Sequence, residues 1–260
     1  MFFFGGTCYA AEVADDIDPL ARGSAAFPHT RWTLVEALRT GGSGSERALG
    51  ELCSIYWYPV YAFVRRDGAA PADAEDLTQG FFAQLLEKEF LTGADASKGK
   101  LRTYLLTALK RYKINEYRKG ARQKRGGGAV AVPLDADDAE QRFREEPAEF
   151  DDPEVLFERR WALSLLDEAF DRTEAEYLAA GRADVFAAIS PFLAGREATD
   201  PRYAEIGSQL EMSAGAVQVA VHRMRKRYRR QLEAAVAETV ESAEDVEAEL
   251  EHVLRVLSSG

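Results

Sequence analysis

The sequence has few of the residues that usually build disulfide frameworks and metal centres. Its 260 residues include only two cysteines, Cys8 and Cys53, and three scattered histidines, His29, His222 and His252. Neither a disulfide framework nor a zinc site has its ligands at usable spacing. We therefore expect no metal and no cofactor, and we interpret Cys53 as a core residue.

Long hydrophobic runs and catalytic motifs are also missing. The apolar residues 1–10 lack a basic leader, are broken at Gly5 and Gly6, and run into acids at positions 15, 16 and 18, so they do not fit a signal peptide. No segment is apolar for long enough to span a membrane. The chain lacks convergent metal ligands, a nucleophile elbow and a phosphate-binding loop. We expect a cytoplasmic protein that is not an enzyme.

The composition that remains is that of an ordinary globular protein, with 46% hydrophobic and 30% charged residues. The length allows one large domain or two small ones with their own cores, and we favour two. The periodic segments repeat at helical spacing, so the predicted fold class is all-α. Residues 1–28 show no periodicity, and we expect them to be a disordered N-terminal tail.

Cations are concentrated between residues 98 and 125. This stretch holds eleven Lys or Arg residues and one acid, Glu116, although the whole chain carries a formal net charge of -11. Helical spacing predicts a buried stripe that consists of Leu101, Tyr104, Leu105, Ala108, Leu109 and Tyr112. The opposite face is expected to carry Arg102, Lys110, Lys113 and Tyr117, flanked by Arg111 and Arg118. Such segregation favours a polyanionic partner, and a solvated surface helix is the alternative.

Helical patterns also precede this basic stretch. They cover residues 30–41 and 46–66, and Pro59 should kink or divide the second helix. A third helix is expected to begin near Pro71, followed by three acids at positions 73, 75 and 76, close to the N-terminus where the helix dipole favours negative charge. Gly80 in the middle of that helix indicates the close approach of a neighbouring group.

The second half of the chain has a different character. Residues 126–152 are acidic and show no sustained helical stripe, so we expect a flexible linker. A helix should begin at Pro153. Further along, a helix over residues 202–210, a tight turn and a longer helix from Ala214 predict a helix-turn-helix, with Ser213 as the cap of the second helix.

The end of the chain, residues 241–260, is acidic and has a helical pattern. Val246, Leu250, Val253 and Leu257 recur at spacings that form a short coiled-coil-like seam. Such a seam needs a partner, which is either another part of this chain or another protein.

Two segments resemble one protein family. The first combines DAEDLTQGFFAQLLE at residues 73–87 with LRTYLLTALKRYKINEYRK at residues 101–119. It is similar to domain 2 of bacterial RNA polymerase sigma factors of the sigma-70 family, extracytoplasmic-function (ECF) type. The second begins at Ser213 and has the pattern S-x-G-x-V-x-x-x-x-H-R-x-R. It is similar to domain 4 of the same family.

The resemblance implies a sigma factor made of two small helical domains. Sigma domain 2 would occupy residues 29–125 and sigma domain 4 residues 153–240, joined by the linker at 126–152 and followed by an acidic helical extension at 241–260. Such a protein binds core RNA polymerase and directs promoter recognition, DNA melting and transcription initiation. An anti-sigma factor is left open as a further partner. The alternative is a stand-alone helix-turn-helix transcriptional regulator that is not bound to polymerase.

Carried over position by position, the resemblance also implies three groups of contacts. Core polymerase would meet Asp73, Glu75, Asp76 and Gln79. The -10 promoter element would meet Lys98, Lys100, Arg102, Lys110, Arg111, Lys113, Asn115 and Tyr117. The -35 element would meet Ser213, Ala214, Ala216, Gln218, His222, Arg223, Arg225 and Lys226.

The chain departs from the family pattern at a few positions. Gly80 stands where the family usually has an acid, and Glu211 stands where it has a turn glycine. Gln218, Val219 and Ala220 replace basic or hydroxyl residues, which would reduce the phosphate contacts at the -35 element and flatten their salt dependence.

Overall fold

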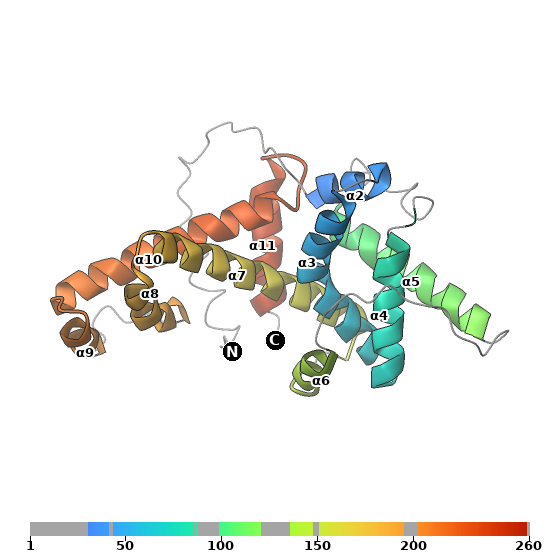
Figure 1. Cartoon of the computed structure of the whole chain (residues 1–260), viewed down its shortest axis with the longest axis horizontal. Helices are drawn as coiled ribbons and strands as arrows, with labels where there is room; N and C mark the ends of the chain where they lie inside the picture. The colour runs from blue at the N-terminus through green and yellow to red at the C-terminus, as the bar shows by residue number, and fades with distance from the viewer. Residues whose placement is uncertain are drawn as a thin grey trace. The chain divides into compact units, whose positions relative to one another are not determined.

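The computed structural model describes residues 31–41, 44–85, 87, 99–120, 136–147, 151–194 and 202–258. Within these ranges the chain is all-α and contains no strand, as the sequence predicts (Figure 1). The tail expected at residues 1–28 lies outside the described part of the chain, as does Lys98. None of the described helices is long and apolar enough to cross a membrane.

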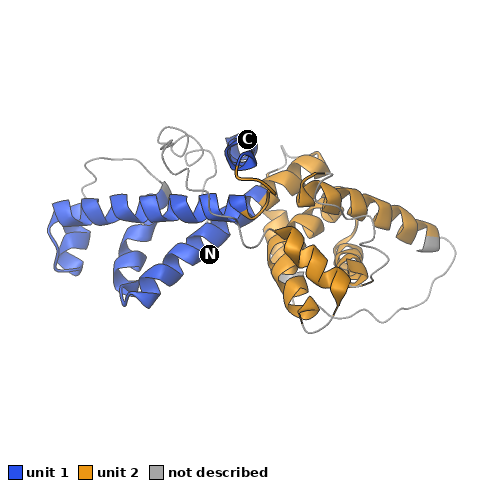
Figure 2. Cartoon of the chain, turned by 90° about the horizontal axis from the view of Figure 1, so that it is seen from above, with its two compact units in different colours: residues 1–25, 162–237, 244–260 blue, residues 26–161, 238–243 orange. Residues whose placement is uncertain are grey.

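The described residues form two compact units (Figure 2). The N-terminal unit contains residues 26–161 and, from late in the chain, residues 238–243. The C-terminal unit contains residues 162–237 and the residues from 244 onward. The division falls inside helix α7, Pro153–Ala179, so its first residues, 153–161, belong to the N-terminal unit.

Helices α2 and α3 begin the N-terminal unit. Helix α2, Arg31–Thr40, buries Trp32, Val35 and Leu38 and is followed by Gly41, whose φ of 72° ends the helix. Helix α3, Ser45–Arg66, continues through Pro59 and is not divided there. Every residue from Tyr56 to Val64 is buried, so packing compensates for the backbone donor that proline removes.

The core of this unit lies where α3 packs against α2 and α4 and where α4 contacts α5 (Figure 1). Helix α4, Pro71–Leu85, contributes Phe81, Phe82 and Leu85, which are at most 1% exposed. Helix α5, Leu101–Gly120, presents the predicted stripe to the core. Five of its six residues are buried, Leu101, Leu105, Ala108, Leu109 and Tyr112. Tyr104 is half-buried and packs its ring 5.9 Å from that of Trp32.

The neighbour expected at Gly80 is the side chain of Tyr112. A Cβ atom at Gly80 would overlap the Tyr112 hydroxyl oxygen. Burial raises the pKa of Tyr112 to about 12, and the carboxylates of Glu116, Asp76 and Glu87 add to the shift. The glycine therefore leaves room for a protonated hydroxyl between α4 and α5.

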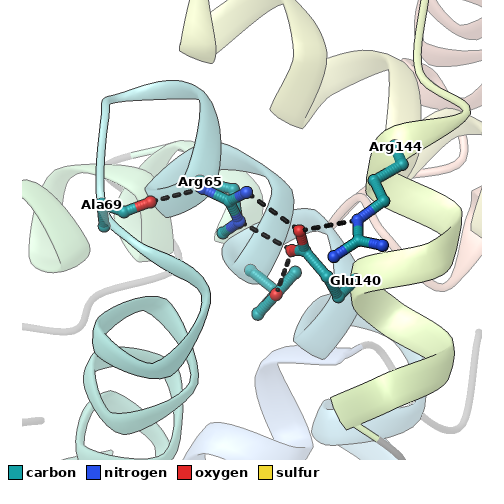
Figure 3. A network of polar contacts seen from close by, with 5 residues as sticks. Arg65, Ala69, Glu140 and Arg144 are labelled. Atoms are coloured by element: carbon teal, nitrogen blue, oxygen red, sulfur yellow. Dashed lines mark hydrogen bonds and ion pairs between the residues drawn. The ribbon is translucent and has the colours of Figure 1, made fainter.

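Helix α6, Ala136–Arg144, occupies part of the stretch expected to be a flexible linker, so the expectation of no helix is wrong for these residues. The Glu140 carboxylate accepts hydrogen bonds from the Tyr61 hydroxyl at 2.7 Å and from Arg65 Nε at 2.8 Å, which fixes α6 to α3 (Figure 3). Near the end of α6, Glu146 accepts a hydrogen bond of 2.5 Å from the Tyr58 hydroxyl. These contacts are polar, and an apolar stripe does not reveal them.

Cys53 lies in the core of the same unit, on α3, where it is 3% exposed. Burial raises the pKa of its thiol to about 12. The interpretation of Cys53 as a core residue is confirmed.

The C-terminal unit is built around helix α10, Ala214–Ala237. This helix contacts α8, Ala183–Ile189, the short 3-10 helix η3, Ser190–Ala194, and α9, Arg202–Gln209. The Tyr228 hydroxyl donates to the Leu166 carbonyl oxygen at 3.1 Å and so joins α10 to α7. The start of α7, which belongs to the N-terminal unit, is capped by Asp152, whose carboxylate accepts a hydrogen bond from the Glu154 amide at 2.8 Å.

Helix α11, Asp245–Ser258, follows a turn after α10 and packs against it. Leu250, Val253 and Leu257 of the predicted seam are buried, and Val246 is half-buried. The partner of this seam is therefore another helix of the same chain.

Candidate functional site

The face of α5 opposite the core is more enclosed than its sequence predicts. Arg102 and Lys113 were expected to project outward, but their exposed fractions are only 5% and 4%. Arg102 Nε lies 2.8 Å from Glu158 Oε2, and the guanidinium sits 4.2 Å from the centroid of the Trp161 ring. Both partners are in the first turns of α7, which helical periodicity within residues 98–125 cannot indicate.

Lys113 and Lys110 also meet carboxylates. Lys113 pairs with Asp67, directly after α3, and burial lowers the pKa of its ammonium group. Lys110 is half-buried and pairs with Glu154 at the start of α7. Three of the cations predicted to meet DNA are therefore paired inside the N-terminal unit.

The accessible part of the basic helix is its C-terminal half. Arg111, Asn115 and Arg118 are exposed, and Tyr117 is 58% exposed. Sequence reasoning missed Ile114, which is 51% exposed and lies among these residues. We call this group, Arg111, Ile114, Asn115, Tyr117 and Arg118, the distal face of α5. Lys100, at the other end, is half-buried.

Helix α4 carries the predicted acid and amide residues. Asp73 and Asp76 are exposed, and Glu75 and Gln79 are half-buried. Gln79 Nε2 donates to Glu75 Oε1 at 2.9 Å, which fixes one amide and one carboxylate one turn apart. These four residues, called here the α4 ridge, remain at the surface while Phe81 and Phe82 are buried.

The turn between α9 and α10 has the predicted form. Ser213 Oγ accepts from the Ala216 amide at 3.2 Å, so it caps α10. Glu211, where a turn glycine was noted as missing, has a φ of 54°, a conformation that favours glycine. Gly207 is required by its surroundings, because a Cβ atom there would lie 2.5 Å from the Met212 carbonyl oxygen.

The predicted contact residues of α10 are mostly accessible. Those that are exposed are Ser213, Ala214, Gln218, His222, Arg223 and Lys226, and Ala216 is half-buried. Arg225 differs, because its guanidinium donates two hydrogen bonds, of 3.0 and 2.7 Å, to the Phe192 carbonyl oxygen. That arginine holds α10 against η3 within the unit.

A cavity of about 450 Å³ lies beside the first half of α10. The residues that line it are Tyr177, Arg182, Met212, Gly215, Ala216, Val219, Ala220, Arg223 and Arg227. The Arg227 guanidinium lies 5.0 Å and the Arg182 guanidinium 5.9 Å from the centroid of the Tyr177 ring. The lining contains three arginines and no carboxylate, so this side of α10 has a positive potential. The sequence patterns did not single out Tyr177 or Arg182, which come from the end of α7 and the turn after it.

Searches among curated proteins and among solved structures found no match. A family model described as ECF sigma factor matches residues 73–234. The matched range begins at the α4 ridge, includes the basic helix α5, and ends near the C-terminus of α10. Because this match covers more than half of the sequence, the chain belongs to the ECF sigma factor family, a family of non-enzymatic factors for transcription initiation.

Proposed function

We propose that this protein binds core RNA polymerase and directs promoter recognition, DNA melting and transcription initiation. The observation that carries the proposal is the combination, inside the family match, of an accessible acid and amide ridge on α4 with accessible cations on α5 and α10. Residues 29–125 would act as sigma domain 2 and residues 153–240 as sigma domain 4. Because its proposed partners are polymerase and promoter DNA, we expect the protein to act in the cytoplasm.

The α4 ridge is proposed to bind core polymerase. Asp73 and Asp76 are exposed, and the Glu75 carboxylate is held in place by the Gln79 amide. An ordered set of carboxylates and amides suits a basic, hydrogen-bonding protein surface, because charge complementarity speeds association and selects the partner.

The distal face of α5 is proposed to bind the -10 element. Arg111 and Arg118 offer phosphate contacts, while Tyr117 and Ile114 offer flat or apolar surface to an unstacked base. Extrusion of a base costs a few kcal/mol, and stacking on an aromatic side chain returns about 1–3 kcal/mol per base. Strand opening can therefore be sustained by contacts alone, without a covalent step.

The first half of α10 is proposed to read the -35 element. Small residues at its N-terminus, Ala214 and Gly215, permit close approach to the major groove, and Gln218 offers an amide to base edges. Arg223 and Lys226 are exposed and available for phosphates. Because Arg225 is engaged with Phe192, it is expected to support the helix instead of DNA.

The proposed function can be tested by run-off transcription with purified core polymerase on genomic fragments. The full chain should give discrete transcripts that core polymerase alone does not give. If no fragment is transcribed above the core-only level while the chain is folded, the proposal is wrong.

A second experiment separates the two proposed surfaces. Reversing Arg111 and Arg118 to glutamate should weaken promoter complexes but preserve binding to core polymerase. Reversing Asp73 and Asp76 to lysine should weaken binding to core polymerase first. Arg47→Glu, on an 86% exposed side chain of α3, shows the effect of a single charge reversal away from both surfaces. Equal loss in both assays for both pairs would contradict the division of roles.

A further inference from the structure

Two carboxylates of α7 cover part of the cationic face of α5 in this structure, and we call these two residues, Glu154 and Glu158, the cover. Glu154 pairs with Lys110, and Glu158 lies 2.8 Å from Arg102. Both acids lie at the start of α7, four residues apart, so they are neighbours on one face of that helix. To the cations of α5, two carboxylates one helical turn apart resemble two successive phosphates of a nucleic-acid strand. Both are rows of single negative charges.

The two ion pairs differ in how firmly they are held. Arg102 and Glu158 have side-chain exposures of 5% and 24%, and Arg102 also stacks on Trp161, so this pair anchors the start of α7. Lys110 and Glu154 are 41% and 54% exposed. Exposed ion pairs contribute little stability, and competing ions screen them. Glu154 therefore forms the end of the cover that gives way first.

We propose that the first two turns of α7 are an internal competitor for DNA. Glu154 and Glu158 occupy Lys110 and Arg102 in the place of phosphates, and DNA gains access to this part of α5 when these carboxylates are released. The inference rests on the proposed function, because it assumes that α5 meets DNA. It adds a regulatory element within the N-terminal unit, made of residues 153–161 and α5.

The cover predicts that removing its charges strengthens DNA binding. We would measure the affinity of the full chain for labelled duplex DNA of random sequence by fluorescence anisotropy, because phosphate contacts dominate nonspecific binding. The variant Glu154→Gln with Glu158→Gln keeps a hydrogen-bond acceptor for Arg102 and should bind about threefold to tenfold more tightly than the unmodified chain. Thermal unfolding of the variant confirms that it is folded.

Two controls separate the cover from a general charge effect. Glu46→Gln with Glu145→Gln removes the same charge from exposed positions of the same unit and should leave the affinity within about twofold. In a Lys110→Gln background, Glu154→Gln should lose its effect, because the competing pair no longer exists.

The outcomes are distinct for the two proposals. Equal affinities for the double variant and the control would overturn the cover, and so would a gain that persists in the Lys110→Gln background. Run-off transcription by the unmodified chain decides the proposed function separately. If the variant shows the predicted gain in DNA affinity but the unmodified chain yields no transcripts with core polymerase, the cover is supported and the proposed role in initiation is wrong.

Discussion

Gly80 and Gly50 both lie inside helices, but their surroundings differ. A Cβ atom at Gly80 meets the Tyr112 hydroxyl, whereas nothing lies within 4 Å of one at Gly50. We expect Gly80→Ala to lower the free energy of unfolding by about 1–3 kcal/mol through overpacking. Gly50→Ala should raise it by about 0.5–1 kcal/mol, because alanine favours a helix.

Denaturant unfolding of both alanine variants measures this difference. Adding Tyr112→Phe to Gly80→Ala removes the crowded oxygen and should recover part of the loss. A shift of the same sign for the two glycines would contradict the structure around Gly80.

Glu211 gives a second prediction at the residue scale. Its φ of 54° lies in the left-handed region, which costs a residue with a Cβ roughly 1–2 kcal/mol. We expect Glu211→Gly to raise the free energy of unfolding by about 1 kcal/mol, since glycine gives back part of the gain as unfolded-state entropy.

The matched control for Glu211→Gly is Gln209→Gly, two residues earlier in the last turn of α9. Glycine in a helix should lower stability there by about 0.5–1 kcal/mol. Thermal unfolding compares the two variants, and a loss of stability in Glu211→Gly would refute the strain at the turn.

Single residues also show where prediction from the sequence ended. Periodicity correctly placed Leu105 and Leu109 in the core, and the mid-helix glycine correctly indicated a close neighbour. Periodicity wrongly placed Arg102 and Lys113 outward, because it describes only the angular position of a residue around its own helix. Glu158, which encloses Arg102, is 56 residues away in the sequence, and no local pattern identifies such a partner.

At the scale of elements, α6 is held by polar contacts with α3. The Arg65 guanidinium lowers the pKa of Glu140 from 4.5 to about 2, and the hydrogen bond from Tyr61 adds to the shift. A carboxyl whose pKa is depressed in the folded state adds stability that is fully present above its unfolded pKa and is lost as the pH falls through its folded pKa. The contribution of Glu140 should therefore disappear between about pH 4.5 and pH 2.

Glu140→Gln tests this assignment. The variant should be less stable than the unmodified chain at neutral pH, by about 1–3 kcal/mol, because a charge-assisted pair with Arg65 is lost. The difference should shrink as the pH falls from 4.5 toward 2. Urea unfolding at a series of pH values measures it, with Glu145→Gln, at an exposed neighbour, as the control. A stability difference that does not depend on pH would show that the charge of Glu140 does not stabilise the contact between α6 and α3.

Elements with a strong apolar stripe were the ones that the sequence predicted well. The bounds of α2, α5 and α9 and the first residue of α10 agree with expectation to within a few residues. Helix α6 was missed because Glu140 within it and Glu146 just after it bind aromatic hydroxyls and arginines of other helices. The seam of α11 was predicted, and the structure shows that three of its four residues are buried within the same chain, where α11 contacts α10.

At the scale of the whole molecule, a chain of net charge -11 keeps accessible cations on α5 and α10. Its affinity for DNA should therefore depend steeply on salt, although the chain is acidic overall. Each lost phosphate contact should reduce the slope of log K against log salt by about 0.9. We expect Arg223→Gln with Lys226→Gln to flatten the slope in this way.

Arg225→Gln is the matched control, because its guanidinium binds the Phe192 carbonyl oxygen. It should lower thermal stability and leave the salt slope nearly unchanged. Anisotropy titrations between about 50 and 200 mM salt give both slopes. A larger change for Arg225→Gln than for the pair would show that the exposed cations of α10 are not the phosphate contacts.

The buried thiol of Cys53 can serve as a chemical probe of how often the core of the N-terminal unit opens. This thiol lies on α3 in the packed core and stays protonated there. It does not react with maleimide or disulfide reagents until the surrounding helices separate. In a Cys8→Ser background, the rate of modification at position 53 then follows the exchange between closed and open forms of that core. The modification rate, measured again with polymerase or DNA bound, would report how much each partner slows the opening of this core.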